Sequence, residues 1–216
     1  ANVLGEEIQD KINKFYEKYV KENYARKSYL ELQFEKQYLS LMIPQLRGKE
    51  GTTAAKKRYA GLIEKSGKEE IEITGLEAIR GDWTAAAQEF QVQLLEKVFH
   101  EEPVEKFIKD YIKKIYDGKL DSKLIYRKSI RKELKEYTKT TPPHVKAARQ
   151  LDKLDSNVIE YYVTIAGPEP IQKLKHKLDY EHYIEKQIKP IANQILGLIE
   201  KDFDKMTQKL KQTTLF

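Results

Sequence analysis

The spacing of apolar residues shows two different periods at the start of the chain. Between positions 4 and 20 apolar side chains recur every three or four residues, which predicts an amphipathic helix. Residues 29–34 and 38–43 instead alternate apolar and polar side chains. This alternation predicts two strands, the second of which ends at Pro44.

A second pair of predicted strands, residues 58–63 and 70–73, surrounds Ser66-Gly67. A dipeptide of this kind suits the tight turn of a β-hairpin. We therefore expect residues 1–83 to hold a helix and a small antiparallel sheet.

Helical spacing returns after Trp83, where Thr84 can cap a helix that includes the apolar residues Phe90 and Leu94. Further elements follow: a helix between Pro103 and Gly118, a short helix after Pro142-Pro143, a β-rich run at 158–165 that ends at Gly167-Pro168, and a helix at about 180–203. The predicted fold class is α+β. Residues 1–83 carry the sheet, residues 84–207 are mainly helical, and residues 208–216 form a flexible tail.

Composition excludes several kinds of protein. The 216 residues are 40% hydrophobic and 34% charged, as in an ordered globular chain. The absence of cysteine excludes disulfide scaffolds, thiol catalysis and cysteine-bound metals. No apolar run approaches the roughly 18 residues of a membrane span, and no signal-peptide pattern is present. We expect a soluble, cytoplasmic protein with no membrane partner.

The net charge of +6 is concentrated in one stretch, residues 119–149, which we call the basic stripe. This stripe holds ten basic and three acidic side chains, a net charge of +7, so the rest of the chain is close to neutral. A local excess of this kind favours an anionic polymer as partner. A solvated lysine-rich helix would give the same count, and charge alone leaves both interpretations open.

No motif for a self-contained catalytic or metal site is present. The four histidines lack a second ligand at metal-binding spacing, and no phosphate-binding glycine loop or nucleophile motif occurs. Asp202 and Asp204 lie on a charged helix end, where solvated side chains are the simpler interpretation. We expect this chain to bind no metal and no cofactor of its own.

The segment Lys56-Lys57-Arg58-Tyr59 places three cations ahead of a predicted strand. On an extended strand Lys57 and Tyr59 would lie on one face, and Lys56 and Arg58 on the other. Such a strand could follow a phosphate backbone. A solvated edge strand, kept from aggregating by its lysines, would explain the same residues.

Two segments resemble the palm of family B DNA polymerases: Lys56-Lys57-Arg58-Tyr59-Ala60, and Thr74-Gly75-Leu76-Glu77-Ala78-Ile79-Arg80-Gly81-Asp82-Trp83. Further blocks resemble the family in the same order, at residues 130–137 with 143–149, at 167–168 and at 179–188. Five ordered blocks span almost the whole chain from Lys56, closest in character to bacterial polymerase II and its archaeal relatives. Gly81 departs from the family, in which many members carry a second arginine there.

The resemblance implies DNA-binding residues in a nucleoid-associated protein. The palm strand would contact primer–template DNA near its newly paired end, through Lys56, Lys57, Arg58 and Tyr59. Arg80 would hold a phosphate, with Asp82 either as its charge partner or as the cap of the following helix. The basic stripe would belong to the thumb, which grips the duplex backbone through Lys132, His144, Lys146 and Arg149.

The family's metal-binding motifs D-x-x-S-L-Y-P and Y-G-D-T-D are missing, as is its nucleotide-binding motif K-x-x-x-N-S-x-Y-G. Two-metal phosphoryl transfer needs those carboxylates, so the resemblance implies that this chain is no polymerase by itself. A large catalytic partner chain would supply the Mg²⁺ site of the DNA-directed DNA polymerase (a nucleotidyltransferase). The chain resembles the small polypeptide of a split, two-chain archaeal enzyme, and we expect the partner to meet its first 45 residues.

The last five residues resemble the sliding-clamp-binding tail of replicative polymerases, with Gln212, Leu215 and Phe216 as the contact residues. Two functions of other classes remain open. The chain could be a stand-alone duplex-DNA-binding protein that uses the same basic stripe. It could also be a helical interaction module whose basic face is only solvated.

Overall fold

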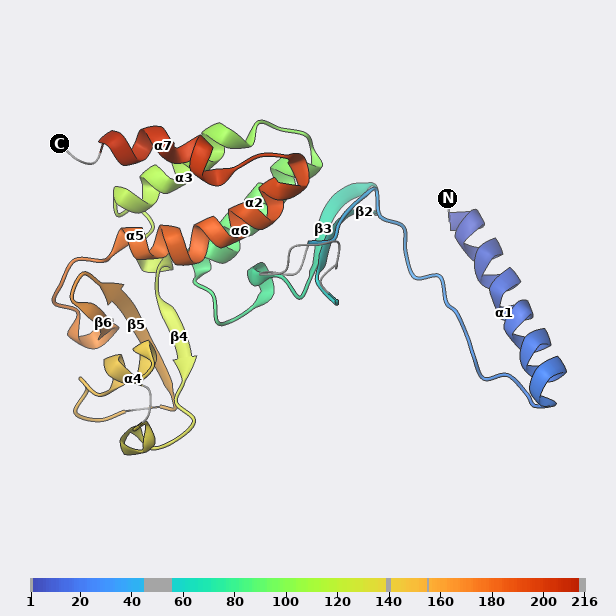
Figure 1. Cartoon of the computed structure of the whole chain (residues 1–216), viewed down its shortest axis with the longest axis horizontal. Coiled ribbons are helices and arrows are strands. Elements are labelled where there is room, and N and C mark those ends of the chain that lie inside the picture. The colour runs from blue at the N-terminus through green and yellow to red at the C-terminus, as the bar shows by residue number, and fades with distance from the viewer. Residues whose placement is uncertain (1, 45–55, 139–140, 155, 214–216) are drawn as a thin grey trace. The chain divides into compact units, whose positions relative to one another are not determined.

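The computed structural model describes residues 2–44, 56–138, 141–154 and 156–213 (Figure 1). The helices are α1 (Asn2–Tyr24), α2 (Ala85–Phe99), α3 (Val104–Tyr116), α4 (Pro143–Ala148), α5 (Tyr180–Tyr183), α6 (Lys189–Leu196) and α7 (Phe203–Thr213). The strands are β1 (Ser40–Met42), β2 (Tyr59–Lys65), β3 (Lys68–Thr74), β4 (Tyr126–Ser129), β5 (Val158–Thr164) and β6 (Gly167–Pro170). Helices beside two small sheets confirm the α+β class.

The chain divides into two compact units, residues 1–41 with 61–70 and residues 42–60 with 71–216. Within the described ranges, no helix is both long enough and apolar enough to cross a membrane.

In the first unit, the segment after α1 bonds to side chains of that helix. The Leu32 N–H donates to Asn13 Oδ1 (2.7 Å) and the Leu32 carbonyl accepts from Asn13 Nδ2 (2.8 Å). The Phe34 N–H donates to Gln9 Oε1 (2.7 Å). The prediction of a strand at 29–34 is therefore wrong, because helix amides satisfy the backbone groups that a neighbouring strand would have satisfied.

The predicted hairpin is confirmed, and its sheet has the order β1-β2-β3. Ser66 (φ 54°) and Gly67 (φ 74°) both have positive φ, as a type I′ turn between β2 and β3 requires. The strand predicted at 38–43 is shorter than expected, because only β1 is extended and paired. Just before β1, the Leu39 N–H donates to the Leu62 carbonyl (2.8 Å).

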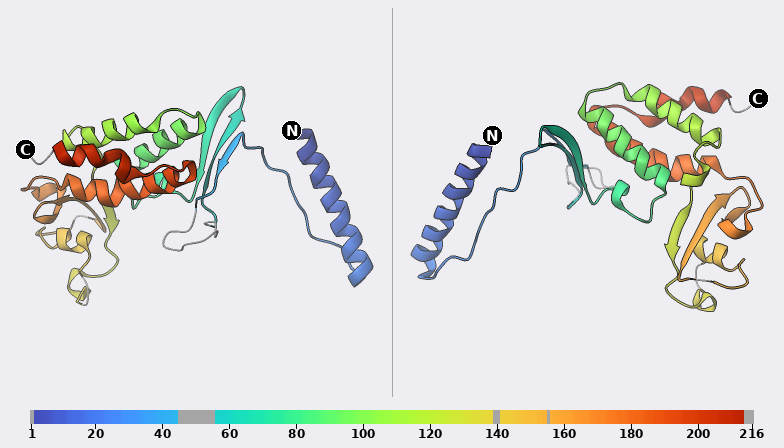
Figure 2. Two further views of the ribbon diagram at one scale, coloured as in Figure 1. Left: turned by 45° about the horizontal axis from the view of Figure 1, so that its top comes forward. Right: turned by 180° about the vertical axis from the view of Figure 1, so that it is seen from behind.

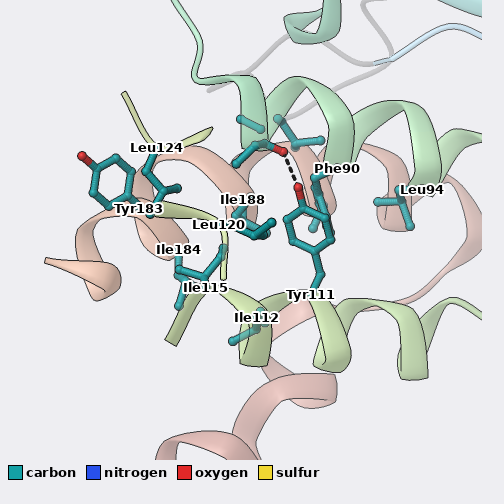
Figure 3. Packing of buried hydrophobic residues seen from close by; sticks show 14 of the residues in the cluster. Phe90, Leu94, Tyr111, Ile112, Ile115, Leu120, Leu124, Tyr183, Ile184 and Ile188 are labelled. Atoms are coloured by element: carbon teal, nitrogen blue, oxygen red, sulfur yellow. Dashed lines mark hydrogen bonds between the residues drawn. The ribbon is translucent and has the colours of Figure 1, made fainter. Parts of the chain in front are cut away.

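The second unit has a helical core. Helix α2 packs on α3 and α6, and α7 packs on α3 and α6 (Figure 1). Figure 3 shows Phe90 and Leu94 of α2 facing Tyr111 of α3, with Ile188 nearby. The Tyr111 hydroxyl donates to the Ala86 carbonyl (2.8 Å), so the buried phenol keeps a hydrogen-bond partner.

Local signals place the ends of these helices as predicted. Thr84 caps α2, and its hydroxyl accepts from the Ala87 N–H (3.3 Å). Gly118 (φ 71°) follows the end of α3 in the left-handed conformation that favours glycine. The helix predicted at about 180–203 is interrupted, because Glu200 adopts a φ of 55° and α7 begins after it.

A second sheet, with the order β4-β5-β6, lies beside α4 in this unit (Figure 2). Tyr126 of β4 pairs with Tyr161 of β5, and Tyr161 pairs with Pro170 of β6. The predicted β-rich run is confirmed as β5. The chain turns at residues 165–166 and continues into β6, so Pro168 lies inside a strand and does not end the β structure. Strand β4, inside the basic stripe, was not expected from the sequence.

A candidate nucleic-acid interface

A basic groove in the second unit joins two segments that lie far apart in the sequence. It is a cavity of about 480 Å³ lined by Gly81, Asp82, Arg127, Lys128, Ser129, Arg131, Tyr137 and His144. Two of these residues precede α2, and the others come from β4, the segment after it and α4. The groove therefore has one wall before α2 and another in the basic stripe.

Arg80 and Asp82 form an ion pair at the first wall. Arg80 Nε and Nη2 donate to the two carboxylate oxygens of Asp82 at 3.0 and 2.8 Å. Lys128 Nζ, from the second wall, lies 3.6 Å from Asp82 Oδ2. Partial burial opposes ionisation of Asp82, but the Arg80 hydrogen bonds and the charge of Lys128 outweigh it and lower its pKa. The expected charge pair is present, and the alternative of Asp82 as a helix cap is wrong because Thr84 is the cap.

The second wall carries the cations Arg127 and Arg131, on segments that hydrogen bonds, an ion pair and a ring contact hold in place. Arg127, with 70% of its side chain exposed, lies 3.2 Å from Glu160 of β5. The Arg131 N–H donates to the Tyr137 hydroxyl (3.3 Å), and the Tyr137 ring meets His144 edge-on at 6.5 Å. Partial burial and nearby Lys128 lower the pKa of His144, which favours the neutral imidazole at pH 7. Arginine and lysine therefore supply the positive charge of the groove at that pH.

The residues predicted from the thumb resemblance have different surroundings. His144 lines the groove, while Lys132 and Lys146 are exposed outside its lining. Arg149 donates from Nη2 to the carbonyls of Leu134 (2.8 Å) and Tyr137 (3.1 Å). Arg149 thus holds in place the segment that carries Tyr137.

The predicted palm strand begins later than expected. Lys56 and Lys57 are exposed in a turn, with a φ of 56° at Lys57, so the alternation of faces predicted from an extended strand is wrong there. Strand β2 starts at Tyr59. A Cβ on Gly75 (φ 64°) would lie 2.2 Å from the Lys57 carbonyl oxygen, so only glycine allows this approach.

Arg58 points away from solvent and forms an ion pair with Glu77. The Glu77 side chain is fully buried, whereas 22% of the Arg58 side chain is exposed. Gln91 Nε2 donates to Glu77 Oε2 (2.9 Å), and its Oε1 accepts from the Ala78 N–H (2.6 Å). The two sequence blocks with palm resemblance are thus joined to each other and to α2.

Comparison with known proteins identifies the family. The model of DNA polymerase family B matches residues 4–201. This chain belongs to DNA polymerase family B. The chain is 40% identical over 187 residues to DNA polymerase II of Escherichia coli (strain K12), covering 82% of this chain and 24% of that protein. It is 33% identical over 229 residues to a DNA polymerase of Pyrococcus glycovorans, covering 97% of this chain and 27% of the relative.

A solved structure of similar fold leads to the same family. The family B DNA polymerase from Pyrobaculum calidifontis matches 83% of this chain with a TM-score of 0.59 and 28% sequence identity. The match covers 23% of that polymerase. The family B chain described here therefore spans about a quarter of the length of these relatives.

Motif reasoning missed three cations of this family B chain, Arg127, Lys128 and Arg131. They were counted in the basic stripe, but no motif singled them out. Their selection depends on β4 and on its pairing with β5, which places them opposite Asp82. The local charge density was the one sequence signal that included them.

The two remaining expectations from the sequence concern metal binding and the C-terminal tail. Among the described residues, no three His, Asp or Glu side chains are grouped as metal ligands would be. Leu215 and Phe216 lie outside the described residues, and of Gln212 only the backbone, near the end of α7, is described.

Proposed function

We propose that this chain is the palm-end and thumb part of a family B DNA polymerase, and that its basic groove holds the backbone of primer–template DNA. The observation that carries the proposal is the gathering of Arg127, Lys128 and Arg131 opposite the Arg80–Asp82 pair in one groove. Phosphate contacts from arginine and lysine position a protein on the duplex without reading sequence, as a polymerase requires.

The Arg80–Asp82 pair suits a phosphate contact. Asp82 accepts from Nε and Nη2 of Arg80, so its carboxylate fixes the plane of the guanidinium. Nη1 takes no part in that pair and would face an incoming phosphate. Exposed Lys56, Lys57 and half-buried Tyr59 would add contacts near the end of the primer.

We further propose that a partner chain supplies the Mg²⁺-binding carboxylates. Support comes from the missing metal motifs and from relatives about four times as long as this chain. The docking surface would be α1 and the segment after it, where large apolar side chains are exposed: Val3 by 69%, Leu4 by 60%, Phe15 by 58% and Tyr24 by 61%. An exposed apolar surface of this kind marks a protein interface. A sliding clamp would bind the tail that includes Gln212, Leu215 and Phe216.

Two experiments test the proposal. In the first, duplex DNA is titrated into the chain at several salt concentrations. Arg127→Ala and Arg131→Ala should each lower the salt slope by about one unit, whereas Lys113→Ala, on exposed α3 surface, removes the same charge and should change little. Equal effects of all three would refute the groove assignment.

In the second experiment, the chain is mixed with the remaining part of a family B polymerase, primer–template, nucleotides and Mg²⁺. Primer extension that requires both chains supports the proposal. DNA binding by this chain without extension by the mixture would indicate a stand-alone duplex-binding protein instead.

A further inference from the structure

A buried amide lies on a helical stretch that contacts both walls of the basic groove. Helix α5 passes into α6 through a π-helical segment, Ile184–Ile188, in which each backbone hydrogen bond spans one residue more than in an α-helix. Gln187 lies in this segment and is 7% exposed. Burial of a flexible polar side chain is costly unless the amide is hydrogen-bonded, so its partners define its role.

On one side, Gln187 holds the start of α2. Its Oε1 accepts from the Thr84 N–H (3.1 Å) and from the Thr84 hydroxyl (3.2 Å). Thr84 is fully buried, and it follows Asp82 and Trp83 directly in the chain. The amide therefore fixes the backbone at the point where the first wall of the groove ends.

On the other side, the same helical stretch contacts the start of β4 through residues just before Gln187. The ring of Tyr126 stacks on that of Tyr183, with centroids 5.5 Å apart. Tyr126 also meets His182 Nε2 at 3.0 Å, and its ring stacks on Tyr161 with centroids 5.3 Å apart. Because Tyr126 directly precedes Arg127 in a short strand, its position sets the position of the second wall.

We propose that Gln187 is a positioning residue that keeps the two walls of the basic groove in a fixed relation: it bonds Thr84 at one wall, and the helical stretch that carries it contacts Tyr126 at the other through His182 and Tyr183. The proposal deepens the proposed function and rests on it only for the effect on DNA. The positioning role itself is a property of the protein without DNA. Gln187 touches no nucleic acid in this assignment, since it does not line the groove.

The variant Gln187→Met tests the proposal because it keeps the length of the side chain and removes both hydrogen bonds from Thr84. The matched control is Gln194→Met, seven residues further along the same helix. The amide atoms of Gln194 are buried without a partner among the described residues, so their removal disturbs no hydrogen bond of this structure. Trp83, the single tryptophan of the chain, lies between Asp82 and Thr84 and reports on the first wall.

We expect Gln187→Met to shift Trp83 emission to longer wavelength and to increase its quenching by acrylamide, while Gln194→Met changes neither. Tyr126→Phe removes the bond at the opposite wall and should also shift Trp83, although Tyr126 is 43 positions away in the sequence. DNA affinity should fall about five- to tenfold for Gln187→Met, and less than twofold for Gln194→Met.

Two results would overturn the inference. One is a folded Gln187→Met whose Trp83 fluorescence and DNA affinity equal those of the unaltered chain. If Gln187→Met does not fold, Tyr126→Phe is the deciding variant. Unchanged Trp83 fluorescence in Tyr126→Phe then refutes the connection between the two walls. If the unaltered chain binds no DNA but the Trp83 shifts occur, the proposed function fails while the positioning role stands.

Discussion

Lys57 and Arg58 are neighbours in the sequence, but the structure predicts opposite consequences for their removal. Arg58 is the ion-pair partner of the fully buried Glu77, whereas Lys57 is exposed. We expect Arg58→Met to lower the free energy of unfolding and Lys57→Met to leave it nearly unchanged. In DNA binding the order reverses, because a solvent-facing lysine can reach a phosphate.

The magnitude follows from burial. Breaking a buried ion pair by removing one partner costs about 3–5 kcal/mol, because the remaining charge is left uncompensated. We take the lower value, about 3 kcal/mol, because 22% of the Arg58 side chain is exposed and Gln91 still donates to Glu77. For a chain of this size, this loss lowers the melting temperature by about 6–12 °C. Lys57→Met should stay within about 0.5 kcal/mol.

Thermal unfolding followed by circular dichroism measures the first effect, and DNA titration over a range of salt measures the second. The double variant Arg58→Met with Glu77→Gln should recover much of the lost stability, because a neutral amide no longer needs a cation. Lys57→Met should lower the salt slope of DNA binding by about one unit. A melting temperature for Arg58→Met within 2 °C of the unaltered chain (about 1 kcal/mol or less) would refute the reasoning.

Three further outcomes are expected. Gly81→Arg should raise the salt slope of DNA binding by about 0.9, because the new cation would enter the groove. The side chain has room, since a Cβ at this position meets no atom within 4 Å. An unchanged slope in a folded variant would contradict this placement. Burial and nearby Lys128 lower the pKa of His144, so the neutral imidazole is favoured in the folded chain. Its protonation as pH falls should therefore strengthen DNA binding and cost stability, and His144→Ala should remove both trends in titrations between pH 5 and 8. Deleting residues 212–216 should leave basal synthesis by the complete polymerase intact and abolish its stimulation by a sliding clamp, and stimulation that persists would rule out the tail assignment.

The parts of the fold that depend on interactions between residues close together in the sequence could be predicted. Ser66-Gly67 forms a turn because two adjacent residues accept positive φ, and Thr84 caps α2 through a bond to a residue three positions away. The strand predicted at 29–34 failed for the opposite reason. Its alternation is real, but its backbone partners are Asn13 and Gln9, which lie 19 and 25 positions earlier than the residues they bond.

The candidate site could be predicted in part. The charge count of residues 119–149 located the cations, and the resemblance to the family implied the Arg80–Asp82 pair as one of two roles for Asp82. The sequence could not tell which cations share a groove. Arg149 looked like a phosphate ligand but holds backbone carbonyls, while Lys128, which no motif singled out, reaches Asp82.

The sequence by itself determined the turns and caps and the concentration of positive charge, because each of these depends on residues close to one another along the chain. It also indicated the family, through five short blocks whose order along the chain needs no structure to be seen. Only the tertiary structure decided that Arg58 bonds to buried Glu77 and that Asp82 faces β4. It also decided that Gln187 bonds to Thr84, 103 positions away. Such contacts depend on how whole elements pack, and packing brings together side chains whose separation along the chain carries no local signal.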